Sequence, residues 1–118
     1  MMAREFLHAL DDMREAITGI ENAVADRTFN DYKTDWMLNH AIQRGIEIIS
    51  EASRALPESV RSLRPEIPWP QVRTIGNVLR HEYHGLSDAI IRRVVTDELP
   101  PLSEAVSWMS EHFASPKE

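Results

Sequence analysis

Apolar side chains recur at helical intervals along almost the whole chain, and this periodicity constrains the fold more than any other feature. In the first stretch the intervals alternate between four and three residues, at Phe6, Leu10, Met13, Ile17, Ile20 and Val24. Such spacing places these side chains on one stripe of an α-helix, here from about Arg4 to Ala25. No stretch with a period of two is long enough for a β-strand, so the sequence predicts an all-α fold.

The next part of the chain is predicted to hold a short turn and a second long helix. Residues 28–32 have the composition of a capped turn, and Asp35 can cap the helix that follows. The inward-facing residues of that helix are Leu38, Ile42, Ile46 or Gly45, Ile49, Ala52 and Leu56. Pro57 ends this helix and can open a short one through Leu63.

Prolines and one glycine set the expected boundaries of the remaining helices. A stiff connector is formed by Pro65, Pro68 and Pro70. Pro70 also suits the first turn of a helix from about Trp69 to His84, closed by Gly85. The next helix starts at Ser87, and Pro100–Pro101 are expected to break it before a last helix begins. The inward-facing residues of these two helices are Ile90, Ile91, Val94, Val95, Leu102, Val106, Met109 and Phe113.

These elements predict an antiparallel bundle of four main helices plus one or two short helices. With 118 residues the chain has room for one hydrophobic core. We therefore expect a single domain over residues 1–114 and a frayed tail at 115–118. The long stripes on the first two helices can be used up within this core, or can pair across a dimer interface.

Composition excludes several functional classes. The chain has no cysteine, which excludes disulfides, thiol catalysis and zinc sites built on cysteine and fits a cytoplasmic location. The N-terminus lacks the apolar region of a signal peptide, and no apolar run approaches the roughly 20 residues that span a bilayer. His8, His40 and His112 lack the spacing of metal ligands, so we assign no metal site and no cofactor.

Charge is distributed unevenly along a chain whose net charge is −6. Residues 68–96 hold four arginines against two acidic residues, a local balance of +2, whereas the other residues hold nine Lys or Arg against seventeen Asp or Glu. An acidic body with one basic segment favours a local anion site over a broad nucleic-acid-binding surface.

The basic segment has an apolar and a polar face when it is projected on a helix. Val72, Ile75, Leu79, Tyr83 and Leu86 form the core face. The polar face carries Arg73, Asn77, Arg80, His81 and His84. Arginine can bind phosphate oxygens, and histidine can move a proton at a ribose 2′-hydroxyl near neutral pH. The same spacing also fits a solvated basic face without a function.

Several motifs of this chain closely resemble the HepT-like branch of the HEPN superfamily. They comprise Pro65-Glu66-Ile67-Pro68-Trp69, the stretch Asn77-Val78-Leu79-Arg80-His81-Glu82-Tyr83, Arg44 to Ala52, and Asp97 to Leu102. The resemblance covers nearly the whole chain. It implies a helical-bundle homodimer that acts as the ribonuclease toxin of a prokaryotic toxin–antitoxin pair.

The resemblance also implies roles for individual residues. Asn77 and His81 match the family's catalytic motif, and Tyr83 matches the tyrosine to which a MntA-like nucleotidyltransferase antitoxin transfers AMP. The family's arginine directly before the Asn falls on Gly76 in this sequence. Arg80 or Arg73, one helical turn away on either side, can replace it only across a changed geometry. A close approach of two helices is one explanation for Gly76.

Three functional hypotheses follow. The first is a metal-independent endoribonuclease with His81 as acid or base, Arg80 or Arg73 on the phosphate, and Asn77 as the orienting residue. In the second, Gly76 marks a lost nuclease that binds RNA, a nucleotide or a partner protein without cleavage. The third is a structural helical adaptor with no ligand.

Overall fold

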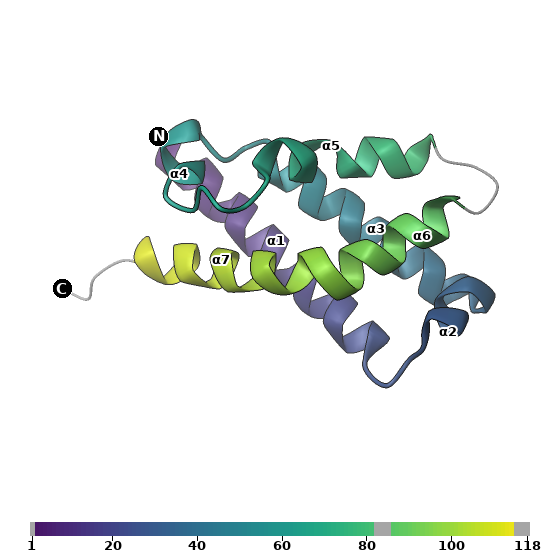
Figure 1. The fold of residues 1–118 in the computed structure, drawn as a ribbon. Helices are drawn as coiled ribbons and strands as arrows, with labels where there is room; N and C mark the ends of the chain where they lie inside the picture. Colours follow the sequence, from purple (N-terminus) through teal and green to yellow (C-terminus); the bar gives the residue numbers. More distant parts are fainter. Residues whose placement is uncertain (1, 82–85, 115–118) are drawn as a thin grey trace.

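The computed structural model describes residues 2–81 and 86–114, and within these residues the chain forms helices and no β-strand. Three of the long segments are α1 (Met2–Val24), α3 (Trp36–Ser53) and α5 (Trp69–Arg80). The fourth is a continuous rod of α6 (Leu86–Arg93), the π-helix η1 (Val94–Glu98) and α7 (Leu99–His112) (Figure 1). Two short helices, α2 (Phe29–Thr34) and α4 (Glu58–Arg61), connect them. The predicted all-α bundle of four main and two short helices is confirmed.

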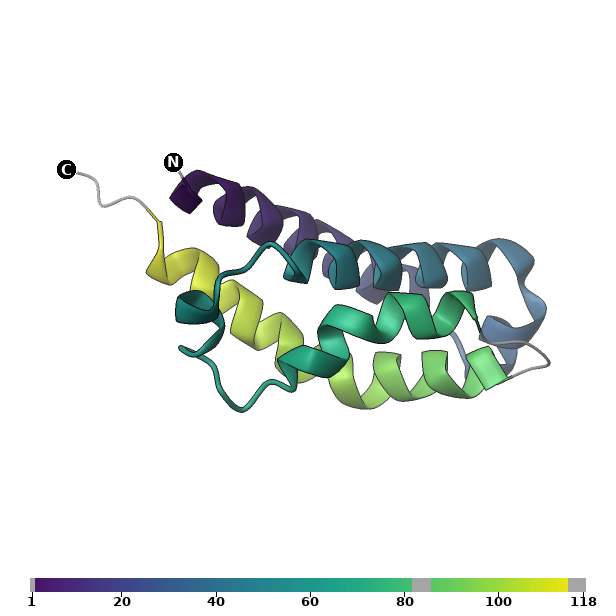
Figure 2. The same ribbon diagram turned by 90° about the horizontal axis from the view of Figure 1, so that it is seen from above.

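Helix α3 occupies a central position in this elongated bundle. It packs against α1 on one side and against α5 on the other (Figure 2). Successive long segments run in opposite directions, so α5 ends at the same end of the bundle at which α3 begins (Figure 1). The surface between α3 and α5 is therefore lined by side chains from two distant parts of the sequence.

The apolar stripes predicted on α1 and α3 form the core. Five of the six stripe residues of α1 are buried and Val24 is half-buried. Gly45 lets the two helices approach closely, because a Cβ at this position would lie 2.7 Å from Ile20 Cδ1. Burial of each large apolar side chain contributes on the order of 2 kcal/mol, so the α1–α3 contact is a principal source of stability.

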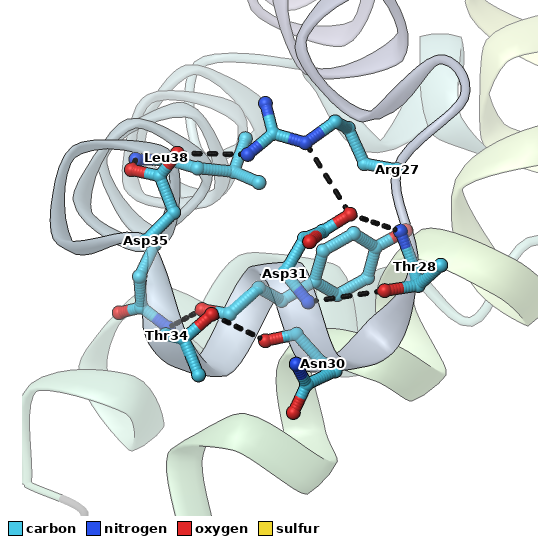
Figure 3. A network of polar contacts seen from close by, with 9 residues as sticks. Arg27, Thr28, Asn30, Asp31, Thr34, Asp35 and Leu38 are labelled. Carbon is cyan, nitrogen blue, oxygen red and sulfur yellow. Dashed lines mark hydrogen bonds and ion pairs between the residues drawn. The ribbon is translucent and has the colours of Figure 1, made fainter.

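The corner between α1 and α3 is held by a polar network (Figure 3). Thr28 and Asp31 cap each other's backbone N–H groups, at 3.2 and 2.8 Å, and this capping box starts a short helix where the sequence predicted a capped turn. As predicted, Asp35 caps α3, and its carboxylate accepts a hydrogen bond from the Leu38 N–H at 3.0 Å. Arg27 also donates to Asp35 at 2.7 Å.

Hydrogen bonding in this corner lowers the pKa of both carboxyl groups. For Asp31 the largest cause is the bond from the Thr28 backbone N–H, and for Asp35 it is the bond from the Leu38 backbone N–H. The Arg27 guanidinium acts in the same direction on both. The charged form of each aspartate is therefore the one that the fold stabilises.

Pro100 and Pro101 do not break the last helical segment, and this prediction is wrong. The chain instead passes from α6 to α7 through the π-helix η1, in which the Leu99 N–H bonds to the Val94 carbonyl. This wider turn brings the two prolines into the first turn of α7, where a missing N–H costs no intrahelical bond. The rod therefore stays continuous.

The proline connector before α5 is anchored by Trp69. The indole is buried, and its Nε1 donates to the carbonyl oxygens of Arg61 and Arg64, both at 3.0 Å. Trp36 differs, because 70% of its surface is exposed. None of the described helices is long and apolar enough to cross a membrane.

Candidate functional site

The basic face of α5 is directed toward α3 and solvent. Asn77 and Arg80 are exposed on it, and the Arg80 Nη2 donates a hydrogen bond to Asn77 Oδ1 at 3.2 Å. The spacing of three residues places both side chains on the same side of the helix. Two of the predicted site residues are thus in direct contact, and the contact orients the guanidinium.

His81 lies at the end of α5 rather than within it. Its φ and ψ angles of −105° and 8° are not helical, and its N–H bonds to the carbonyls of Val78 and Leu79. The predicted helix through His84 is therefore wrong at His81, and the rest of that prediction, residues 82–84, lies outside the described residues. Leu79 is the last residue of α5 whose side chain is buried. The His81 side chain is exposed beside Arg80.

Arg73 is placed differently from the other predicted site residues. It is half-buried, and its carbonyl oxygen accepts hydrogen bonds from Ser50 Oγ at 2.9 Å and from Arg54 Nε at 3.1 Å. Its own Nε is buried, with no hydrogen-bond acceptor among the described residues. Arg73 lines a hollow with Arg54, Pro70, Thr74 and Asn77, whereas Arg80 lines the next one along the groove.

The second hollow, here called the α3–α5 hollow, is polar and has a volume of about 170 Å³. It is lined by Arg44, Glu47, Ser50, Glu51, Arg54, Gly76 and Arg80. Arg44 pairs with Glu47, three residues further along α3, at 3.4 Å. The hollow therefore brings arginines from both helices together.

Gly76 is buried where α5 approaches α3 most closely. A Cβ added to it would lie 3.1 Å from Ser50 Cβ and 3.3 Å from Glu47 Cα. Contacts this short require α3 and α5 to shift by a few tenths of an ångström, because Glu47 Cα belongs to the backbone and Ser50 Cβ is attached directly to it. The explanation of Gly76 as a close helix approach is confirmed.

Sequence reasoning did not assign Arg54 to the site. Arg54 follows the last residue of α3, and it borders both hollows. A sequence signal for it exists, because Arg44, Glu47, Glu51 and Arg54 recur at spacings of three and four residues. That signal identifies a charged face of α3 but does not show that α5 lies against it.

Two residues of the predicted basic segment, Tyr83 and His84, lie outside the described residues. Among the residues that the structure does describe, no group of three or more His, Asp or Glu side chains is placed to hold a metal ion. The described part of the site consists of arginines from α3 and α5, Asn77 and the exposed His81 at the end of α5.

Comparison with known proteins places this chain in a family. The family model described as "Ribonuclease HepT-like" matches residues 13–109. A protein of Thermococcus cleftensis named "Probable ribonuclease HepT" is 34% identical over 101 residues, which cover 86% of this chain and 92% of that protein. "Putative RNase MJ1380" of Methanocaldococcus jannaschii is 27% identical over 106 residues, covering 90% and 97%.

A third relative, "Putative RNase TTE0752" of Caldanaerobacter subterraneus subsp. tengcongensis, is 34% identical over 79 residues, covering 67% of this chain and 70% of its own length. No solved structure matches the chain. The family match spans α3 and α5 entirely and so includes every described residue of the site. The chain belongs to the HepT-like ribonuclease family.

Proposed function

We propose that this protein is a metal-independent endoribonuclease whose active surface includes Asn77, Arg80 and His81. The observation that carries the proposal is the hydrogen bond between Arg80 and Asn77 beside an exposed histidine, in a chain that belongs to a ribonuclease family. Arg80 is an exposed cation that makes no ion pair among the described residues. Its guanidinium is therefore available to a phosphate.

The chemistry requires few groups. His81 accepts the proton of a ribose 2′-hydroxyl while the 2′-oxygen forms a bond to phosphorus and the bond from phosphorus to the 5′-oxygen breaks. Arg80 donates to the non-bridging oxygens, where negative charge develops. A second acid must then protonate the leaving 5′-oxygen, and the His81 of a second copy can supply this proton.

A homodimer is accordingly part of the proposal. The outer side of α1 and α3 has a depression lined by small and aliphatic residues together with four charged ones, Asp12, Glu15, Arg44 and Glu51. The small and aliphatic residues include Ala16, Gly19, Ala23, Ala41, Ile48 and Ala52. Arg44 borders both this face and the α3–α5 hollow. A second copy on this face would thus lie beside the proposed active surface.

We further propose that the protein is the toxin of a cytoplasmic toxin–antitoxin pair, silenced by a MntA-like nucleotidyltransferase that transfers AMP to Tyr83. This part rests on the sequence resemblance, in which Tyr83 follows His81 by two residues. Intact-mass measurement after coexpression with a neighbouring nucleotidyltransferase tests it. Mass added in AMP units, and absent from Tyr83→Phe, is the expected result; unmodified protein in both would contradict it.

The ribonuclease proposal is tested with purified protein, several classes of RNA and EDTA. We expect EDTA-resistant cleavage that His81→Ala abolishes. His8→Ala is the matched control, because His8 is exposed on α1, the helix that begins at the opposite end of the bundle from His81 (Figure 1). No cleavage by the native protein, or equal loss in both variants, would contradict the proposal.

A second candidate is a binding module without cleavage, and the packing of Gly76 favours it. The short distances to Ser50 and Glu47 mean that even the Cβ of an arginine at this position would require a small shift of the helices. In this case RNA or a nucleotide binds and does not turn over. Cleavage by Gly76→Arg alone, with none by Gly76→Ala or the native protein, would support this candidate and exclude the first.

A further inference from the structure

We propose that Arg54, together with the α3–α5 hollow, binds a backbone phosphate of RNA next to the one that is cleaved. Arg54 would be a substrate-binding residue, separate from the reacting groups. The identity of the ligand rests on the proposed function. The anion site itself can be tested by a binding measurement, which does not require cleavage of RNA.

The first observation is a cluster of arginines without carboxylate partners in an acidic chain. Arg27, Arg44, Arg64 and Arg93 each pair with a carboxylate within 4.0 Å. Arg54, Arg73 and Arg80 make no such pair with any described residue, although the chain has 19 acidic residues. They nevertheless gather along one groove, because Arg54 borders both hollows. Bringing like charges together is unfavourable, and an anionic ligand would offset it.

The second observation is that Arg54 is held in place. Its Nε donates to the Arg73 carbonyl at 3.1 Å, and Ser50 donates to the same oxygen at 2.9 Å. The guanidinium is therefore oriented by α5, while its two terminal nitrogens have no acceptor among the described residues. A planar pair of donors fits two oxygens of one phosphate.

The third observation concerns charge and space in the hollow. Three arginines and two glutamates line it, and Arg44 already engages Glu47, so Glu51 is the acidic group that opposes a ligand. The excess of one positive charge includes Arg80, which the proposed mechanism places on the cleaved phosphate, so a flanking phosphate held by Arg54 would lie beside that group. Gly76 contributes no side chain to the lining, which leaves the hollow open between Arg54 and Arg80.

The position along α5 indicates which phosphate is bound. Arg54 contacts residue 73, eight residues before His81, which corresponds to about 12 Å at 1.5 Å per residue. The backbone positions of residues 73 and 81 are thus about two helical turns apart, and in this proposal Arg54 and His81 act at neighbouring phosphates. Arg54 would therefore hold a flanking nucleotide, and its loss should raise KM and leave kcat nearly unchanged.

The test uses a single-stranded RNA oligonucleotide with 2′-O-methyl groups, which cannot be cleaved by 2′-hydroxyl attack. We expect Arg54→Ala to weaken binding by about tenfold and to reduce the slope of log K against log salt by about 0.7. Arg54→Lys should keep the slope and lose part of the affinity. Arg14→Ala is the matched control, because Arg14 is exposed on α1 and lines neither hollow.

Several results would overturn the inference. One is equal binding by Arg54→Ala and Arg14→Ala, with folding of both verified by circular dichroism. Another is displacement of the bound oligonucleotide by free AMP as effectively as by unlabelled oligonucleotide, because this result would indicate a site for a single nucleotide. Binding lost in Arg54→Ala without cleavage by the native protein would support the site and contradict the ribonuclease proposal, so the two failures are distinguishable.

Discussion

Gly76 on α5 lies so close to Ser50 on α3 that a Cβ at residue 76 would approach Ser50 Cβ to 3.1 Å. The two helices meet at this point, and the hydrogen bond from Ser50 Oγ to the Arg73 carbonyl fixes their relative position one turn earlier. Gly76 is thus a packing residue of the groove, and the groove is lined by arginines on both sides of it.

Substitution of Gly76 should therefore destabilise the fold despite a gain in helix propensity. Replacing glycine with alanine inside a helix stabilises it by up to about 1 kcal/mol, whereas overpacking at a tight contact costs about 1–3 kcal/mol. We expect Gly76→Ala to lower the free energy of unfolding by about 1 kcal/mol. Denaturant titration measures this change.

Gly19 offers the matched control for this measurement. It lies within α1, and a Cβ added there would meet nothing within 4 Å. Gly19→Ala should raise the free energy of unfolding by up to about 1 kcal/mol. If both alanine variants were stabilised equally, the close contact between Gly76 and α3 would be wrong.

Asn39 is expected to be important for stability because it links three helical elements. Its Nδ2 donates to the Tyr32 carbonyl at 2.8 Å and to Asp88 Oδ1 at 3.2 Å. Asn39→Ala would leave half-buried acceptors unsatisfied and should cost about 2 kcal/mol. Asn30→Ala, at an exposed position of α2, should stay within about 0.5 kcal/mol of the native protein. Similar thermal melting of both variants would contradict this role.

The lowered pKa values of Asp31 and Asp35 predict the direction of acid unfolding. A carboxyl group whose pKa is lower in the folded state contributes stability that is fully present above its ordinary pKa of about 4. That stability is lost as pH falls through the lowered, folded-state pKa. The free energy of unfolding should therefore fall between about pH 5 and about pH 2.

Asp35→Asn tests this prediction with little loss of capping, because asparagine is also a good N-cap residue. The variant should lose less stability between neutral and acidic pH than the native protein does. Asp12→Asn removes an exposed carboxylate that makes no hydrogen bond to a described residue, and it controls for the change in net charge. Parallel pH profiles for Asp35→Asn and the native protein would be evidence against the network in Figure 3.

Apolar periodicity was enough to predict most of the fold. The stripe from Phe6 to Val24 and the Asp35 cap are local features that tertiary packing did not override. The continuous rod through Pro100 was not predictable from local rules, since it depends on a π-helix that accommodates the prolines.

Only the part of the candidate site that lies on α5 could be predicted from the sequence. Asn77 and Arg80 lie three residues apart, so their contact follows from helix geometry. The structure ends α5 at Arg80, an end that neither the motif nor the apolar spacing through Tyr83 predicts. The approach of Arg54 to Arg73 joins residues 19 positions apart in sequence. Such a contact is a consequence of tertiary packing and has no local signal.

Asn77 and Arg80 should act as a unit in cleavage if the ribonuclease proposal is correct. Arg80→Ala removes the donor to the phosphate and should lower kcat/KM by about 100-fold. Asn77→Ala removes only the hydrogen bond that orients Arg80, so a loss of about fivefold is expected. Because Asn77 is proposed to act through Arg80, adding Asn77→Ala to Arg80→Ala should cause no further loss of kcat/KM.

This coupling is measured from the cleavage rates of the native protein, the two single variants and the double variant, with thermal melting as the check on folding. Additive losses in the double variant would show that Asn77 contacts the substrate itself, and unchanged cleavage in Arg80→Ala would remove Arg80 from the proposed mechanism.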